Sequence, residues 1–184
     1  GTLTFMLGGR AADVERAREI VAPMAGNTIA CGEAGAGIAA KLVNNMMLFI
    51  GVMAMSEGSQ LAEQLGLDAK IFWEVARVSS GDSWPLRTWY PVPGVLENAA
   101  ANNNFDATFS VDLARKDCGL AVQAGDTTGV HLPAARLALA QLDELIADGL
   151  GAKDCTLVAK LASPDGTLRG YDPSLDRTLE GTRS

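Results

Sequence analysis

The sequence predicts a mostly α-helical protein, in which a helical bundle surrounds one long buried helix and two short strands come first. The main observation is the segment from Gly37 to about Leu65, which contains no proline and keeps an apolar helical period. Hydrophobic residues also make up 48% of the 184 residues, which is enough for a sizeable core. Only two short stretches, both near the N-terminus, are of strand type.

These two strands are expected at residues 2–8 and 27–31, which contain β-branched residues and are bounded by glycine. The segment between them, 12–24, is predicted to be a helix that Pro23 limits at its far end. Its apolar residues recur at helical spacing, at Val14, Ala17, Ile20 and Val21.

The long helix from residue 37 to about residue 65 would extend about 43 Å. Residues 46–55, in its middle, are apolar nearly all round, which is typical of a helix buried on every side. In a domain this small, such burial favours a second subunit. Gly51 and Gly58 each cost about 0.8–1 kcal/mol inside a helix, a cost that close approach of another helix would justify.

Turn and capping residues predict the elements that follow. Gly66 is the expected left-handed end of the long helix, with Leu67 as the apolar residue after it. Asp68 is the expected N-cap of the next helix. Residues 79–94, with three prolines, are predicted to be a loop or a broken helix.

The C-terminal half is predicted to contain three helices and a tail. Pro133 suits the first position of a helix, and Asp154 suits an N-cap. The predicted segments are an irregular connection at 98–105, a helix at 112–127 softly interrupted at Gly119 and Gly125, a helix at 133–147, a short helix up to 161, and a loosely packed tail at 163–184.

Charge and cysteine content exclude several classes of function. The formal net charge of −7 argues against a nucleic-acid partner. No signal peptide is evident, and the apolar run at 46–55 is too short to span a bilayer, so no membrane partner is expected. Cys31, Cys118 and Cys155 are widely spaced and only one histidine is present, so no metal site is predicted. A reducing, cytoplasmic setting is the simplest interpretation.

The most informative segment is the glycine-rich entry into the long helix, where Lys41 and Asn45 share one helical face. A lone cation among apolar residues has two possible explanations. Either Lys41 has a role in chemistry, or its stem lies on apolar surface while its ammonium reaches water. Gly35 and Gly37 either let a carboxylate approach the free N–H groups of the helix start or only form a tight turn. Asn44 points about 100° away and is interpreted as structural.

Four motifs follow one another along the chain. They are Gly32-x-x-Gly35-x-Gly37-x-x-x-Lys41-x-x-Asn44-Asn45, then Gln64 to Asp68, then Ser79-Ser80-Gly81 with Trp84 and Pro91-Val92-Pro93-Gly94, and finally Phe109 to Ala121 with Lys116-Asp117. Together they give the chain a resemblance to the β-hydroxyacid dehydrogenases over roughly residues 1–161. The first motif resembles the start of that family's all-helical C-terminal domain, which is like that of 6-phosphogluconate dehydrogenase. The third resembles the 3-hydroxyisobutyrate dehydrogenase branch, which implies a role in valine catabolism.

The resemblance implies roles for particular residues. Lys41 is the acid–base group, and Asn45 holds it or binds the substrate carboxylate. Lysine accepts the hydroxyl proton if its pKa is lowered, as an apolar wall or a nearby cation would do. Lys116 contacts the nicotinamide or its ribose, and Asp117 pairs with Lys41 or orients Lys116. The other substrate contacts are expected from Gly35, Gly37, Trp84 and Phe109, although the two aromatic residues are alternatively plain core.

The resemblance also implies a fragment, because the family's cofactor domain would come before this point and the sequence contains no G-x-G-x-x-G loop. Residues 1–33 are then the remnant of a truncated Rossmann domain, 34–162 the helical substrate and dimerisation domain, and 163–184 a tail. The expected enzyme uses NAD, with NADP left open, on a small 3-hydroxy carboxylate, and forms a dimer or tetramer. A tartronate semialdehyde reductase and a non-catalytic helical dimerisation module are the alternatives.

Overall fold

A computed structural model describes residues 1–176, and packing divides the chain into two units at Met47/Leu48. The first unit contains β1 (Leu3–Gly8), α1 (Ala11–Val21), β2 (Ala25–Gly32) and the start of α2 (Ala36–Gln64). The second contains the rest of α2, α3 (Ala69–Ala76), α4 (Trp84–Thr88), η1 (Ala100–Asn103), α5 (Val111–Thr128), α6 (Pro133–Ala147), η2 (Cys155–Val158), α7 (Ala159–Ala162) and η3 (Pro173–Leu175). The domain boundary that the sequence predicts after residue 33 stays a prediction.

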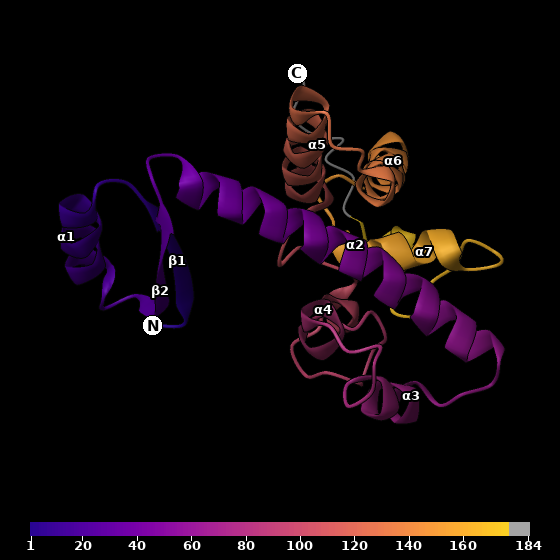
Figure 1. Cartoon of the computed structure of the whole chain (residues 1–184). Coiled ribbons are helices and arrows are strands. Elements are labelled where there is room, and N and C mark those ends of the chain that lie inside the picture. Colours follow the sequence, from indigo (N-terminus) through magenta and orange to yellow (C-terminus); the bar gives the residue numbers. More distant parts are fainter. Residues whose placement is uncertain (177–184) are drawn as a thin grey trace, which may run out of the picture. The chain divides into compact units, whose positions relative to one another are not determined.

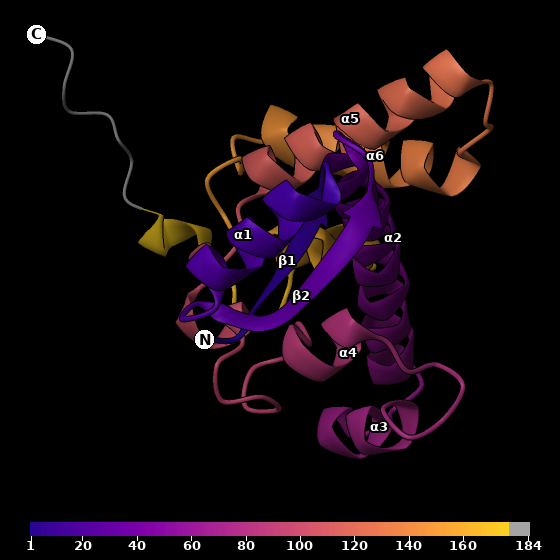
Figure 2. The same cartoon turned by 60° about the vertical axis from the view of Figure 1, so that its left-hand side comes forward.

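The first unit begins as a strand, a helix and a second strand parallel to the first (Figure 2). The register pairs Leu3 with Ala25 and Met6 with Ile29, and α1 makes the crossover between the strands. Both predicted strands and the helix between them are therefore confirmed. Their origin in a truncated Rossmann domain stays a prediction.

Helix α2 runs unbroken through 29 residues, as the sequence predicts (Figure 1). It ends in a Schellman motif: the N–H of Gly66 donates to Glu63 O and that of Leu67 to Ala62 O, both at 3.0 Å. The φ of +78° at Gly66 explains why glycine stands there.

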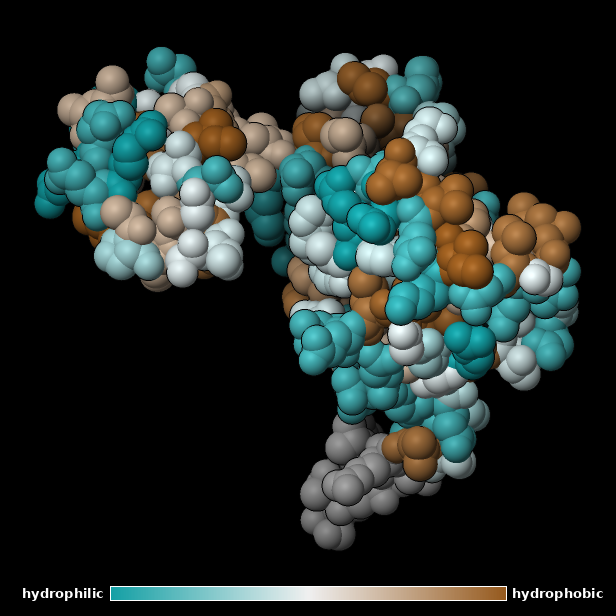
Figure 3. All heavy atoms as spheres, turned by 90° about the horizontal axis from the view of Figure 1, so that it is seen from below, coloured by the Kyte–Doolittle hydropathy of each residue, from teal (hydrophilic) through white to brown (hydrophobic). Residues whose placement is uncertain are grey.

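The apolar middle of α2 is not buried on every side in the described chain. Phe49 and Val52 are fully buried, but Met47 is 64% exposed and Ala54 is also exposed. By length and composition alone, α2 would pass for a membrane-spanning helix, although only 22% of its most apolar window is buried here. Figure 3 shows that hydrophobic residues, in brown, occur at the surface of the molecule. The all-round burial expected from the sequence is thus wrong for this chain by itself.

The core of the second unit is formed by apolar side chains of α2, α5 and α6, together with side chains of the segments that connect the helices. Helices α5 and α6 lie side by side as a hairpin (Figure 1). On α2, Gly51 lets α4 come close, because a Cβ there would lie 3.2 Å from the ring of Pro85, whereas Gly58 faces open space. The largest fully buried side chains include Tyr90, Phe49, Phe105, Leu142, Leu145 and Leu157.

Side-chain caps fix where several helices begin. Asp68 accepts hydrogen bonds from the N–H groups of Lys70 and Ile71 at 3.0 and 2.9 Å, so the predicted N-cap of α3 is confirmed. Asp154 likewise caps η2 through the N–H of Thr156, at 3.1 Å. Helix α5 passes through Gly119 and Gly125 without interruption, so the predicted soft interruptions are absent. Gly125 is required by packing, because a Cβ there would lie 2.6 Å from a methyl group of Leu132.

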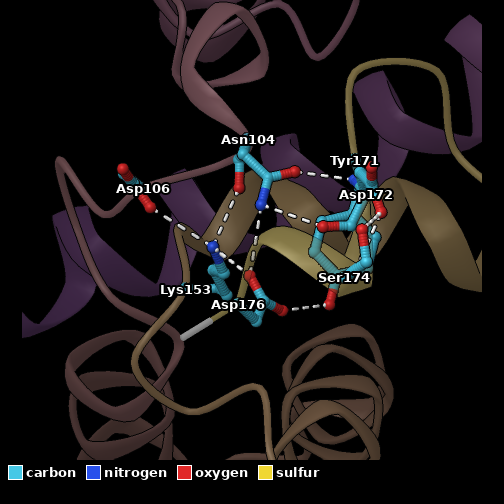
Figure 4. Close-up of polar contacts among 7 residues, drawn as sticks. All are labelled: Asn104, Asp106, Lys153, Tyr171, Asp172, Ser174 and Asp176. Carbon is cyan, nitrogen blue, oxygen red and sulfur yellow. Dashed lines mark hydrogen bonds and ion pairs between the residues drawn. The ribbon is translucent and has the colours of Figure 1, made fainter. Parts of the chain in front are cut away.

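The segment 163–176 packs against the body of the second unit, which corrects the loosely packed tail that the sequence predicts. Lys153 lies at the centre of the contact: its Nζ reaches Asp176 Oδ1 at 2.5 Å, Asp106 Oδ1 at 3.2 Å and Asn104 O at 3.1 Å (Figure 4). Leu168 is buried, and Tyr171 packs edge-on against Phe105. The rest of the predicted tail, 177–184, lies outside the described residues.

Candidate active site

Lys41 lies in an open depression of the first unit, between the start of α2 and strand β1. The depression has a volume of about 450 Å³. Among the described residues that line it, Lys41 alone is charged. The lining residues are Thr4, Phe5, Met6, Gly37, Ile38, Lys41, Asn44 and Asn45. A single cation beside amide and apolar groups suits a small carboxylate ligand.

The apolar wall expected around Lys41 is only partly present in this chain. Lys41 itself is exposed, as are Ile38 and Val43 on neighbouring turns, whereas Leu42 and Met46 are half-buried. The apolar side chains are therefore adjacent to the lysine, but they do not remove it from solvent within residues 1–176.

Asn45 lines the same depression as Lys41, which brings together the two residues predicted to act on substrate. Asn44 also lines it, and its Nδ2 donates to Asn45 Oδ1 at 3.3 Å. Asn44 thus lies beside the candidate site, and its interpretation as structural stays a prediction. Helical phase separates Asn44 from Asn45 by about 100°. The Asn44 side chain is nevertheless long enough to turn toward its neighbour.

The two glycines before Lys41 have different explanations. A Cβ on Gly37 would lie 2.2 Å from Met6 O, so this glycine is required by the close approach of α2 to β1. Gly35 lies in the turn before α2 with a φ of +92°, and a Cβ there would contact nothing within 4 Å. Close packing thus accounts for Gly37, which still lines the depression. The predicted substrate contact of Gly35 stays a prediction.

Lys116 and Asp117 are on α5 in the second unit. Lys116 is exposed, and its Nζ lies 3.1 Å from Oδ1 of the buried Asp117. This ion pair supports the alternative in which Asp117 orients Lys116. Lys41 belongs to the first unit, so the alternative in which Asp117 pairs with Lys41, and the expected cofactor contact of Lys116, stay predictions.

The aromatic residues singled out in the sequence form one cluster in the second unit. Trp84 meets Trp89 edge-on at 5.0 Å between ring centroids, and Trp89 lies 6.1 Å from Phe109. Phe109 in turn lies 5.8 Å from the buried Phe49. Trp84 is 51% exposed, so it is not plain core, whereas Tyr90, in the same connection, is fully buried.

The cysteines do not suggest nucleophilic chemistry. Burial raises the pKa of Cys118 to about 11 and that of Cys155 well above its ordinary value, which disfavours the thiolate. Within residues 1–176, no group of three or more His, Cys, Asp or Glu side chains is placed to hold a metal ion.

Comparison with known proteins shows what the chain resembles. Residues 35–162 match the family described as the NAD-binding domain of NADP-dependent 3-hydroxyisobutyrate dehydrogenase. A probable 3-hydroxyisobutyrate dehydrogenase of Mycobacterium tuberculosis is 46% identical over 132 residues, which are 72% of this chain and 45% of that protein. An NAD-dependent L-serine dehydrogenase of Pseudomonas aeruginosa is 38% identical over 164 residues, which are 89% of this chain and 55% of that protein.

A solved structure agrees with these relatives. The 3-hydroxyisobutyrate dehydrogenase of Mycobacterium tuberculosis, determined with L-serine, superposes with a TM-score of 0.82 at 41% identity, covering 87% of this chain and 55% of that chain. The chain therefore spans about half the length of the relatives it matches. The nicotinamide cofactor expected from the sequence agrees with the family and with the serine dehydrogenase, which is NAD-dependent.

Proposed function

Because the chain belongs to the 3-hydroxyisobutyrate dehydrogenase family, we propose that it supplies the substrate site and the acid–base lysine of an NAD-dependent oxidoreductase. The reaction is oxidation of a small 3-hydroxy carboxylate to its semialdehyde. The observation that supports this most is the shared depression, in which Lys41 is the single charged lining residue and Asn44 and Asn45 lie beside it.

The proposed chemistry assigns one task to each side chain. Lys41 Nζ accepts the hydroxyl proton of the substrate while hydride leaves the same carbinol carbon and a carbonyl forms. The amide of Asn45, held by the Asn44 amide, donates to the substrate carboxylate. The predicted substrate contacts of Trp84 and Phe109, which belong to the second unit, stay predictions.

The cofactor contact proposed for this chain is small. NAD, when bound, supplies the hydride acceptor. Lys116 fits one contact with it, because its ammonium is exposed and fixed by Asp117. The glycines at the start of α2 do not fit a phosphate cradle, since the space beside Gly37 is taken by the carbonyl of Met6. We therefore propose that the 184 residues alone do not reduce NAD.

The substrate remains to be chosen among similar small acids. L-serine is itself a 3-hydroxy acid, and the relatives include an L-serine dehydrogenase and a dehydrogenase determined with L-serine. 3-Hydroxyisobutyrate, L-serine and tartronate semialdehyde in the reverse direction are therefore the substrates to compare.

The test uses the gene product that contains these residues together with whatever precedes them in the gene. Lys41→Ala should lower kcat by about 10²–10⁴-fold, because proton transfer is lost, and should leave the assembly unchanged by size-exclusion chromatography. Lys70→Ala, at an exposed lysine of α3, is the matched control. Wild-type kcat in Lys41→Ala would reject the catalytic role and favour the helical assembly module. NAD reduction by the 184 residues alone would contradict the proposal that these residues provide only part of the cofactor contact.

We also propose that the chain forms a homo-oligomer through α2. Met47 and Leu61 are exposed large apolar residues of this helix, and the exposed Leu65 directly follows its last residue. Apolar surface of this kind marks interaction sites. Leu61→Glu should shift the protein toward monomer in sedimentation velocity, and an unchanged sedimentation coefficient would count against α2 as the interface. The cytoplasmic location stays a prediction.

A further inference from the structure

A second cavity lies in the second unit, far along α2 from Lys41. Its volume is about 420 Å³. One wall is the last part of α2, and the other is the loop that follows α7, yellow in Figure 1. This loop lies beyond residues 35–162, which match the family. The lining residues are Gln60, Glu63, Gln64, Ser163, Pro164, Asp165, Thr167, Leu168 and Arg169.

Two buried polar groups of the second unit, one of them in the cavity lining, have no hydrogen-bond partner among residues 1–176. Gln60 lines the cavity and is only 5% exposed, and its Nε2 is such a group. The hydroxyl of Tyr90, a fully buried residue, is the other. A buried donor without an acceptor is costly, so an acceptor that reaches Gln60 through the cavity is favoured.

Charges of both signs line the same cavity. Arg169 makes one long hydrogen bond, from Nη2 to Pro93 O at 3.4 Å, which leaves most of its guanidinium N–H groups for a ligand. Glu63 forms no ion pair in the described part of the chain. The carboxylate of Asp165 is engaged by its own turn, since it accepts hydrogen bonds from Ser163 Oγ, Thr167 N and Thr167 Oγ1 at 2.7–3.0 Å.

Tyr90 lies within electrostatic reach of both Glu63 and Arg169. The pKa of Tyr90 is raised to about 12, mainly by burial; the carboxylate of Glu63 adds to the rise and the guanidinium of Arg169 opposes it. The arrangement at the cavity itself comes from its lining, in which Gln60, Glu63 and Arg169 occur together.

We propose that this cavity binds a small zwitterion, an α-amino acid. Its carboxylate accepts from Gln60 Nε2 and the guanidinium of Arg169, and its ammonium donates to Glu63. A plain anion suits the cavity less well, because two carboxylates line it against one guanidinium. The site is independent of the proposed dehydrogenase reaction, since none of its residues lines the Lys41 depression.

The test is isothermal titration calorimetry on the 184-residue chain with L-alanine, L-serine and L-valine as probes. Propionate and ethylammonium, the two halves of L-alanine, should each bind at least about tenfold more weakly than L-alanine. Arg169→Gln and Glu63→Gln should each weaken binding about 10–100-fold, because each removes a hydrogen bond to a charged group. Gln60→Met should weaken it as well, since the methionine side chain cannot donate.

Two controls separate this site from general effects and from the Lys41 depression. Glu57→Gln changes the same charge on the same helix but lies outside the cavity lining, so affinity should stay within about twofold. Lys41→Ala should leave the affinity for L-alanine and L-valine, which carry no 3-hydroxyl group, unchanged. Near-UV circular dichroism establishes that each variant is folded.

Three results would overturn the proposal. The first is that none of the three amino acids binds the wild-type chain at about 10 mM, a concentration that would detect even millimolar affinity. The second is that affinity survives in both charge variants. The third is loss of binding in Lys41→Ala alone, which would assign the zwitterion to the other depression.

Discussion

Replacing Asp154 with alanine should strongly destabilise the second unit, because this carboxylate organises two separate segments. Asp154 is 1% exposed. Its Oδ2 accepts hydrogen bonds from Thr108 N, Thr108 Oγ1 and Phe109 N at 2.8–3.1 Å, and its Oδ1 from Thr156 N and Thr156 Oγ1 at 3.1 and 2.7 Å. The side chain thus holds Phe109, a proposed substrate contact, against the start of η2.

The magnitude follows from the donors that lose their acceptor. The two hydroxyl groups can turn to other partners, but the backbone N–H groups of Thr108, Phe109 and Thr156 cannot. A hydrogen bond to a charged group is worth about 1.5–3 kcal/mol, so three of them set an upper range of about 4.5–9 kcal/mol. Partial relaxation brings the expected loss for Asp154→Ala to about 4–6 kcal/mol. Asp154→Asn keeps one acceptor oxygen and should lose about half as much.

The assay is urea unfolding followed by tryptophan fluorescence, which reports on the second unit because Trp73, Trp84 and Trp89 all lie there. Asp126→Asn is the matched control, since Asp126 forms an exposed ion pair with Arg136 and should cost at most about 1 kcal/mol. If Asp154→Ala loses no more than this control, the carboxylate is not the tie between the two segments.

Further predictions concern packing, pH and thiol reactivity. Gly37→Ala should destabilise the first unit by about 1–3 kcal/mol, because its Cβ would overlap a carbonyl of β1. Gly58→Ala, with open space around it, should instead stabilise α2 by about 0.8–1 kcal/mol. Equal melting temperatures of the two variants would contradict this reasoning. Burial alone would lower the pKa of Lys153, but hydrogen bonds to two carboxylates outweigh this effect and raise the pKa. The contribution of Lys153 to stability is therefore complete below about pH 10 and is lost as pH rises through the raised pKa. The melting temperature should consequently fall less steeply at alkaline pH in Lys153→Met than in the wild type. At pH 8 a thiol reagent should label Cys31 in the native chain and all three cysteines after denaturation, and a second native label would contradict the burial of the other two.

Most of the fold could be predicted because local signals and packing agree. The long proline-free apolar run, the Gly66 cap and the Asp68 cap each act within a few residues, and each predicted element is present in the structure. The packed segment 163–176 could not be predicted, because its contacts to Asn104 and Lys153 join residues far apart in sequence. A polar, proline-containing segment has no local signal that distinguishes a docked strap from a loose tail.

The candidate site was predicted in part. The i, i+4 spacing places Lys41 and Asn45 on one face, and both line the depression. The place of Asn44 there could not be predicted, because it depends on a side-chain rotation and not on helical phase. The degree of solvent exposure of Lys41 also could not be predicted, since apolar neighbours in sequence are not necessarily packed over the ammonium group.

The β1–β2 pair has a consequence for handling the chain. A sheet of two parallel strands, as the described residues form it, leaves a row of N–H and C=O groups along the outer side of each strand. Leu3 and Ile29 are exposed beside these rows. Such borders readily recruit further strands, from the same polypeptide or from another copy. The N-terminal unit is thus the part of the molecule through which a concentrated preparation would begin to aggregate.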